Sequence, residues 1–239
     1  MFIADLHVHS KYSDGQLTVP ELVDFYGKQG FGAIAITDHV CEDSTFLGKA
    51  AKYLEYTLTE ESFPHYFQEL QEQAERAWFQ YRMIVMPGLE LSKNSLINQR
   101  SAHILALNIS EFISADAEIL DIVKEIREQN ALSVAAHPVW TGKMEPQTYH
   151  LWQQKEELEN YIDAWEVASG PRLFTEVARS KLKKIATSDL HNPQQIESWK
   201  TVFNCERHPE AIMQAIRKQD VNFRFYKSYD QNSINQLKV

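Results

Sequence analysis

The sequence predicts an α/β protein, and three observations support this fold class. Short apolar runs alternate with segments of helical spacing such as residues 119–126, as in successive βαβ units. The length of 239 residues suits one α/β barrel, a fold of roughly 200–250 residues. Histidines and acidic residues follow several of the apolar runs, where a parallel barrel builds its active site. A barrel is therefore favoured over an open sheet, although periodicity alone does not distinguish the two.

The predicted strands are short apolar runs, as expected for strands buried on both faces of a parallel sheet. After the first run, Thr18 can cap a helix whose first turn holds Pro20 and Glu21, and Gly30 can end it. The same alternation then continues to residue 187. The seven predicted strands are residues 2–8, 33–37, 83–86, 102–107, 132–136, 162–167 and 184–187.

One segment, residues 48–81, is longer than the rest of the pattern requires. Phe67, Leu70 and Ala77 would lie on one face of a helix there. Because apolar helical stripes usually face a core, a helix pair on the barrel wall is favoured over a lid above the site. We expect residues 1–226 to form a single domain and residues 227–239, rich in Gln and Asn, to be a frayed tail.

Composition and charge narrow the classes of function. The formal net charge of −9 argues against a dedicated surface for nucleic acid or anionic membranes, but bound cations would still allow an acidic substrate. Cys41 and Cys205 lack the spacing of a metal site or a disulfide framework, which suggests ordinary thiols in a reducing compartment. No basic leader and no apolar run of roughly 20 residues are present, so we expect a cytoplasmic protein without a membrane partner.

The histidines are the main functional signal in the sequence. Of nine histidines, six lie at or just beyond the expected carboxyl end of a predicted strand, whereas His65, His150 and His208 fall in helical or loop contexts. Side chains two apart on a strand share a face, so His7 and His9 should project together with Asp5. The six are His7, His9, His39, His103, His137 and His191.

Three acidic residues accompany these histidines. Asp14 lies on the loop after the first predicted strand, Glu90 ends the third, and Asp189 follows the seventh. A single buried histidine is usually a hydrogen-bonded core residue. Six histidines with several acids would leave many unsatisfied polar groups in a core unless they bind metal. Nitrogen and oxygen ligands of this kind suit zinc, manganese or iron.

The motifs carrying these residues resemble the PHP (polymerase and histidinol phosphatase) superfamily, in the family's order, from residue 5 to about residue 191. Parts of the sequence are also similar to the TrpH-like branch, which includes nucleoside 3′,5′-bisphosphate phosphatases and 5′–3′ exoribonucleases. That branch has a helical insertion between the fourth and fifth strands, where this chain has only residues 110–130. The motifs are Asp5-Leu6-His7-Val8-His9-Ser10, Ser13-Asp14-Gly15, Thr37-Asp38-His39, Gly88-Leu89-Glu90, His103, Ala136-His137-Pro138 and Ser188-Asp189-Leu190-His191.

The resemblance implies a distorted (β/α)7 TIM-like barrel with three divalent metal ions at the carboxyl ends of its strands. It also implies that one carboxylate, that of Glu90, bridges two of the metals. The implied ligand sets are His7, His9, Glu90 and Asp189 for one metal, Glu90, His103 and His137 for a second, and Asp14, His39 and His191 for a third.

The chemistry favoured by this site is hydrolysis of a small phosphomonoester by a metal-bridging hydroxide. Glu90, Asp189 and His137 would hold that hydroxide, while His191 and Arg172 would contact the substrate. Arg172 and Ser169 only partly match the Asn and Arg that the family carries after its sixth strand. Three alternatives stay open: a phosphodiesterase or exonuclease acting on short oligonucleotides, a histidinol-phosphate phosphatase, and a metal-binding regulatory domain without turnover.

Overall fold

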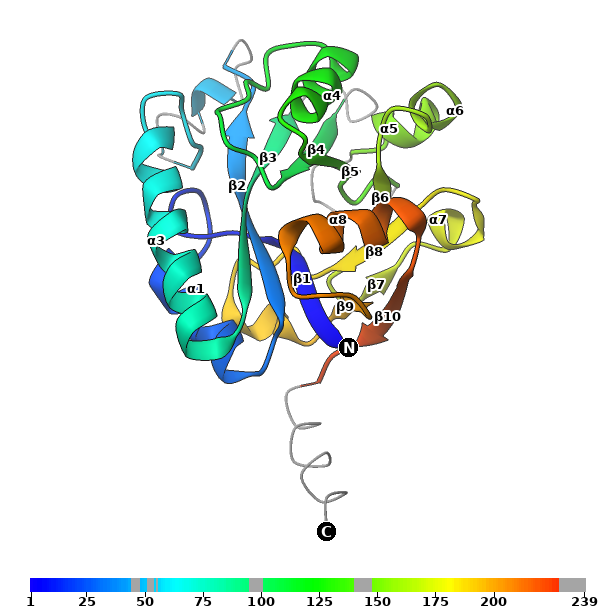
Figure 1. Ribbon diagram of the computed structural model, residues 1–239. Coiled ribbons are helices and arrows are strands. Elements are labelled where there is room, and N and C mark those ends of the chain that lie inside the picture. The colour runs from blue at the N-terminus through cyan, green and yellow to red at the C-terminus, as the bar shows by residue number, and fades with distance from the viewer. Residues whose placement is uncertain (44–47, 51–53, 55, 95–100, 140–147, 228–239) are drawn as a thin grey trace.

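The computed structural model describes residues 1–43, 48–50, 54, 56–94, 101–139 and 148–227 of the chain. In this part, ten strands form one curled, mixed sheet with helices on both of its faces (Figure 1). The strands are β1 (Phe2–Val8), β2 (Ala33–Cys41), β3 (Ile84–Lys93), β4 (Ala102–Leu107), β5 (Leu132–Ala135), β6 (Ala164–Ser169), β7 (Arg172–Leu173), β8 (Lys184–Thr187), β9 (Trp199–Phe203) and β10 (Val221–Phe225). The α/β, TIM-like class expected from the sequence is confirmed.

The order of strands along the sheet is β10-β9-β1-β2-β3-β4-β5-β6, after which both β7 and β8 pair with β6. A parallel bridge between Val8 and Leu190 then brings the end of β8 back to β1. The amide of His9 donates to the carbonyl of Leu190 at 2.9 Å at the same place. The sheet therefore curls far enough for its first and last parallel strands to meet.

The helices begin and end where local chemistry supports them. In α1, Thr18 accepts from the amide of Glu21 while the Glu21 carboxylate accepts from the amide of Thr18 at 2.8 Å, which confirms the predicted cap. Within the described residues, no helix is long and apolar enough to cross a membrane. The helices are α1 (Val19–Lys28), α3 (Phe63–Tyr81), α4 (Ile119–Glu128), α5 (His150–Gln153), α6 (Lys155–Leu158), α7 (Thr175–Arg179), α8 (Pro209–Lys218) and the 3₁₀ helix η2 (Pro193–Ile196).

The two faces of the sheet pack against different helices. Along β2, Ile34 and Ile36 belong to an apolar cluster with residues of α1, α3 and α4, whereas Ala33 and Ala35 belong to a second cluster with α8. Side chains alternate across a strand, so His39 shares its face with Ala33 and Ala35. The inner face of the curled sheet is thus apolar beside α8 and polar toward the carboxyl ends of its parallel strands.

Helix α3 lies beside α1 and against β3 (Figure 1). Leu70 and Ala77 are buried, and Phe67 and Ala74 pack against the same cluster, as the apolar stripe predicts. The less favoured alternative, a lid above the site, stays untested, because residues 44–47, 51–53 and 55 lie outside the described part. The predicted frayed tail falls almost entirely on residues 228–239, which also lie outside it.

The expectation of a wholly parallel sheet is wrong for three strands. β4 is antiparallel to both β3 and β5, β7 is antiparallel to β6, and β9 is antiparallel to β1 and β10. His103 is therefore the second residue of β4 and not at its carboxyl end. Because β4 runs in the opposite direction, its beginning lies at the sheet edge where its neighbour β3 ends. β7, β9 and β10 were not predicted at all.

Candidate metal centre

The structure brings all nine predicted metal ligands together in three groups at this edge of the sheet. Within each group, one potential ligand atom from every residue lies within 4.8 Å of the others. The first group is His7, His9, Glu90 and Asp189; the second is Glu90, His103 and His137; the third is His9, Asp14, His39 and His191. The groups match the predicted sets except that His9 also joins the third.

The first group consists of four buried side-chain atoms that converge on one point. His7 Nε2 lies 3.2 Å from Glu90 Oε2 and 3.3 Å from Asp189 Oδ1, and His9 Nε2 lies 3.3 Å from both oxygens. All four atoms are buried and make no hydrogen bond to the described residues. Buried polar atoms are normally satisfied, so this convergence fits a bound cation.

The second group is organised around the other oxygen of the same glutamate. Glu90 Oε1 lies 2.8 Å from His103 Nδ1 and 3.2 Å from His137 Nε2. Since Glu90 Oε2 faces the first group, the carboxylate of Glu90 lies between the two groups. This placement suits a carboxylate that bridges two ions.

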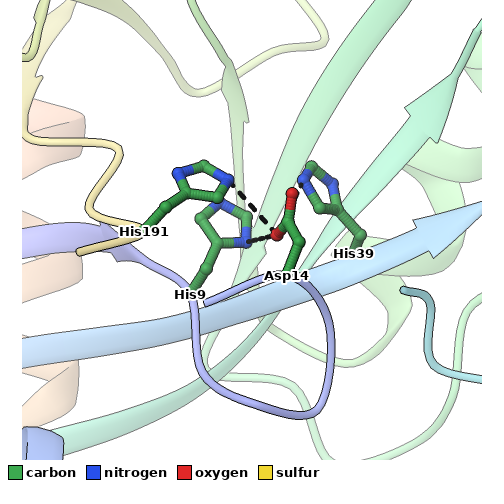
Figure 2. Close-up of side chains that lie close together, drawn as sticks. All are labelled: His9, Asp14, His39 and His191. Atoms are coloured by element: carbon green, nitrogen blue, oxygen red, sulfur yellow. Dashed lines mark ion pairs between the residues drawn. The ribbon is translucent and has the colours of Figure 1, made fainter. Parts of the chain in front are cut away.

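The third group surrounds the carboxylate of Asp14, with histidines from three different segments (Figure 2). Asp14 Oδ1 lies 3.2 Å from His191 Nε2, 3.6 Å from His39 Nε2 and 3.8 Å from His9 Nδ1. A nitrogen and oxygen set of this kind suits zinc, manganese or iron.

The loop that carries Asp14 is held by a buried acid outside the three groups. Asp38 accepts from the amide of Ser10 at 2.8 Å and from the hydroxyl of Ser13 at 2.6 Å. Gly15 then turns back so closely that a Cβ there would lie 2.2 Å from the carbonyl oxygen of His9. Only glycine fits at this position, which explains the Ser13-Asp14-Gly15 motif.

Glu166 is the functional residue that the sequence analysis missed. It is fully buried in β6, and its carboxylate accepts from His7 Nδ1 at 2.9 Å and from the amide of His137 at 2.6 Å. The only available signal was a glutamate inside an otherwise apolar strand, Ala164–Ser169. A buried acid without a partner is costly, so its presence there indicates that a specific partner exists.

Asp5 does not join His7 and His9 in the site, contrary to the expected alternation. β1 shifts its register between Asp5 and Val8, and such a bulge breaks the two-residue period of a strand. The carboxylate of Asp5 instead accepts from Tyr26 Oη at 2.7 Å and from the amide of Ser188 at 2.9 Å, and pairs with Lys200 at 3.1 Å. It thereby fixes the residue that precedes Asp189.

Two of the candidate ligands have unusual backbone conformations. His137 has φ +27° and Asp189 has φ +54°, in the left-handed region that non-glycine residues rarely adopt. Such conformations persist only where surrounding contacts enforce them, and they gather at functional sites. The amide of His137 donates a hydrogen bond to Glu166. Next to Asp189, the amide of Ser188 donates a hydrogen bond to Asp5.

Electrostatic coupling within the cluster shifts the pKa values of its members in opposite directions. Burial disfavours charge on His9, but the adjacent carboxylates of Asp189 and Glu90 outweigh it and raise the pKa of His9 to about 9. The pKa of His7 is raised in the same way, against burial, by Asp189 and Glu90. Burial would raise the pKa of Glu90, yet His7, His39 and His103 hold it well below its ordinary value.

The pKa values around Asp14 follow the same logic. Its burial is outweighed by His191 and His39, which lower the pKa of Asp14 to about 2. His39 differs from His7 and His9, because burial dominates there and lowers its pKa to about 3. His39 is therefore neutral near pH 7 and has a lone pair ready for a metal.

A pocket of about 590 Å³ opens beside the three groups. Its lining includes seven of the candidate ligands, and also Arg172, Phe174, Gln195 and Tyr56. The pocket thus contains the predicted substrate residues Arg172 and His191. Tyr56, Phe174 and Gln195 are lining residues that the sequence analysis did not identify, since no motif marks them.

Comparisons with known proteins agree with this geometry. The chain matches the PHP domain over residues 5–206. No curated protein matches it. Among solved structures, a two-domain protein from Bacteroides vulgatus that contains a predicted PHP-like metal-dependent phosphoesterase is 23% identical, with a TM-score of 0.67. The match covers 94% of this chain, which spans only 65% of the length of that protein.

Two further solved structures share the fold at lower identity. A predicted metal-dependent phosphoesterase from Bifidobacterium adolescentis is 15% identical, with a TM-score of 0.51, and the match covers 79% of this chain and 87% of that one. PsfC from Pseudomonas syringae is 17% identical, with a TM-score of 0.57 and coverage of 99% and 96%. The family match extends over most of the sequence and includes every candidate metal ligand; the chain belongs to the PHP domain family.

Proposed function

We propose that this chain is a hydrolase that cleaves small phosphomonoesters at a centre of three divalent metal ions. The observation that carries the proposal is the convergence of His7 Nε2, His9 Nε2, Glu90 Oε2 and Asp189 Oδ1, all buried and without a hydrogen bond to the described residues. Such a cluster is expensive to bury unless a cation binds there. Membership of the PHP family supports the same class of reaction.

Three ligand sets would hold the ions, as the sequence analysis expected. When bound, divalent ions lower the pKa of water and neutralise the charge that develops on phosphoryl oxygens. The carboxylate of Glu90 would be shared by two sets, because its two oxygens face different groups. Glu90, Asp189 and His137 would position the attacking water, since all three border the pocket.

Arg172 and His191 would orient the substrate in this account. Both line the pocket beside the metal ligands. The guanidinium of Arg172 offers a planar pair of donors that matches two oxygens of a phosphate. His191 Nε2 lies 3.2 Å from Asp14 Oδ1, so a substrate oxygen near the third group would lie close to His191 as well.

Two features favour a small monoester over a polynucleotide. Arg172 is the single Lys or Arg among the described residues that line the pocket, whereas grooves for polynucleotides are rich in such residues. The net charge of −9 would repel a long phosphate backbone. A short oligonucleotide, cleaved as a diester by the same groups, is the second candidate.

Turnover by purified, metal-loaded protein tests the proposal. An aryl phosphate monoester should be hydrolysed well above the rate of the corresponding diester. A panel of nucleoside bisphosphates, sugar phosphates, histidinol phosphate and short oligonucleotides would then identify the leaving group. Faster cleavage of diesters would favour the exonuclease alternative. Bound metal without any turnover across the panel would instead favour a metal-binding regulatory domain.

A further inference from the structure

Glu166 lies at the point where four segments of the curled sheet meet. It projects from β6 and is fully buried. Its Oε1 accepts from His7 Nδ1 of β1 at 2.9 Å and from Thr187 Oγ1 at the end of β8 at 2.5 Å. Its Oε2 accepts from the amide of His137, just after β5, at 2.6 Å. One carboxylate thus receives three hydrogen bonds from outside its own strand.

These bonds act on two different groups of candidate ligands. His7 belongs to the first group and His137 to the second. An ionised carboxylate only accepts hydrogen bonds, so contact with Glu166 requires the proton of neutral His7 to lie on Nδ1. The lone pair is then on Nε2, the nitrogen that faces Glu90 and Asp189.

The bond to His137 acts on the backbone and not on the ring. His137 has φ +27°, and its amide points at Glu166. A strained residue keeps its conformation only if contacts enforce it. Once its backbone is fixed, His137 Nε2 lies 3.2 Å from Glu90 Oε1.

We infer that Glu166 is a positioning residue that sets the affinity of both the first and the second metal groups. It does not belong to any of the three groups itself, and it does not line the pocket. Partners that orient a metal-binding histidine in this way change metal affinity by about 10–100-fold when they are lost. The inference rests on the proposed metal ligands and adds a residue that no motif assigns.

The substitution Glu166→Gln tests this role, because the amide keeps the shape of the carboxylate but replaces one acceptor oxygen with a donor NH₂. Either His7 or the amide of His137 then loses its acceptor. We expect the affinity for Zn²⁺, measured by competition with a chromophoric chelator, to fall about 10–100-fold. Asp163→Asn is the matched control: Asp163 directly precedes β6 and accepts from the amide of Ser133 at 3.1 Å, away from the metal groups.

Equal Zn²⁺ affinity in wild type, E166Q and D163N would overturn the role of Glu166 and leave the proposed metal centre intact. Absence of Zn²⁺ binding in the wild type would contradict the metal centre itself, and the role of Glu166 with it. If E166Q does not fold, ¹⁵N NMR of the Zn²⁺-loaded wild type can instead show which ring nitrogen of His7 carries the proton. A proton on Nδ1 of His7 is expected, and an unprotonated or metal-bound Nδ1 would overturn the inference.

Discussion

His7 shows how a single residue is prepared to bind a metal. One ring nitrogen is occupied by Glu166 at 2.9 Å, while the other faces Glu90 and Asp189 at 3.2 and 3.3 Å with no hydrogen bond to any described residue. Once the ring is neutral, this arrangement keeps its proton on Nδ1 and leaves the lone pair of Nε2 available to a metal. Glu90 has a similar role, because its Oε2 faces His7 in the first group and its Oε1 faces His103 in the second.

Loss of the His7 or Glu90 side chain should therefore impair both metal binding and hydrolysis. His7→Ala and Glu90→Ala should each lower the metal content measured by elemental analysis and reduce turnover by more than about 100-fold, beyond the loss expected for an outer contact. His65→Ala and His208→Ala are the controls, since neither residue belongs to a metal group. Unchanged metal content in both H7A and E90A would refute the ligand assignment.

Arg172 should affect substrate binding and not metal binding. Arg172→Ala would remove a charge-assisted contact to phosphate worth about 1.5–3 kcal/mol, which corresponds to roughly a 10–150-fold increase in KM. Metal content should stay at the wild-type level, because Arg172 lines the pocket without belonging to a group. Steady-state kinetics with an aryl phosphate provide the measurement, and an unchanged KM would remove Arg172 from the substrate site.

The pKa shifts predict how metal binding depends on pH. In the metal-free protein the pKa of His9 is about 9 and that of His7 is also raised, so both rings are protonated at pH 7. Because the folded pKa lies above the unfolded value, this protonation stabilises the metal-free fold below about pH 6.5 and is lost as the pH rises through about 9.

A metal must displace these protons before it binds. Calorimetric titration with Zn²⁺ near pH 7, in two buffers of different ionisation enthalpy, should reveal a net release of protons. The release should decline, and the affinity increase, as the pH approaches about 9. Binding at pH 7 with no proton release would show that the histidines are not protonated in the metal-free protein.

At the scale of the elements, the sequence predicts the positions of the strands better than it predicts whether neighbouring strands are parallel or antiparallel. The runs at Phe2–Val8, Ala102–Leu107 and Lys184–Thr187 form strands with the expected bounds, because their apolar residues are buried on both faces. The reversal of β4 could not be predicted, since a short apolar run looks the same in either direction. His103 was nonetheless assigned to the site, because the resemblance to PHP proteins relies on motif order and not on strand direction.

The remaining gaps at this scale have similar causes. β9 and β10 carry polar residues such as Lys200 and Arg224 that mask the apolar pattern. The bulge in β1 depends on pairing with β2, so alternation wrongly placed Asp5 beside His7. Glu166 was missed because its partners are distant in sequence: His7 is 159 positions away.

Helix α3 makes a specific contribution to the sheet through Tyr66. Its single hydroxyl proton is shared between the carbonyl oxygens of Ile36 at 3.0 Å and Gly88 at 2.9 Å. At this point of the sheet Pro87 lies opposite Ile36 and has no N–H to donate. Tyr66→Phe would leave buried carbonyls short of a donor and should lower the free energy of unfolding by about 1–3 kcal/mol. Urea denaturation measures this change, and an unchanged midpoint would contradict it.

At the scale of the whole molecule, the candidate ligands come from nearly every part of the curled sheet. His7, His39, Glu90 and His103 lie in β1 to β4, while His137 and Asp189 follow β5 and β8. Ions bound to these residues would tie the first and last strands of the curl together. Metal at 100 times its dissociation constant stabilises the fold by about 2.7 kcal/mol, which corresponds to roughly 5–11 °C in Tm for a chain of this size.

Removal and return of metal in the wild-type protein show whether hydrolysis depends on the bound ions. The protein would be stripped with a chelator and reloaded stepwise with Zn²⁺, Mn²⁺ or Fe²⁺, while metal content, Tm and hydrolysis of an aryl phosphate are followed together. We predict that the stripped protein is inactive and melts at a lower temperature, and that both properties recover as the metal content rises. Full phosphatase activity in the metal-free protein would show that the proposed metal centre is not required for hydrolysis.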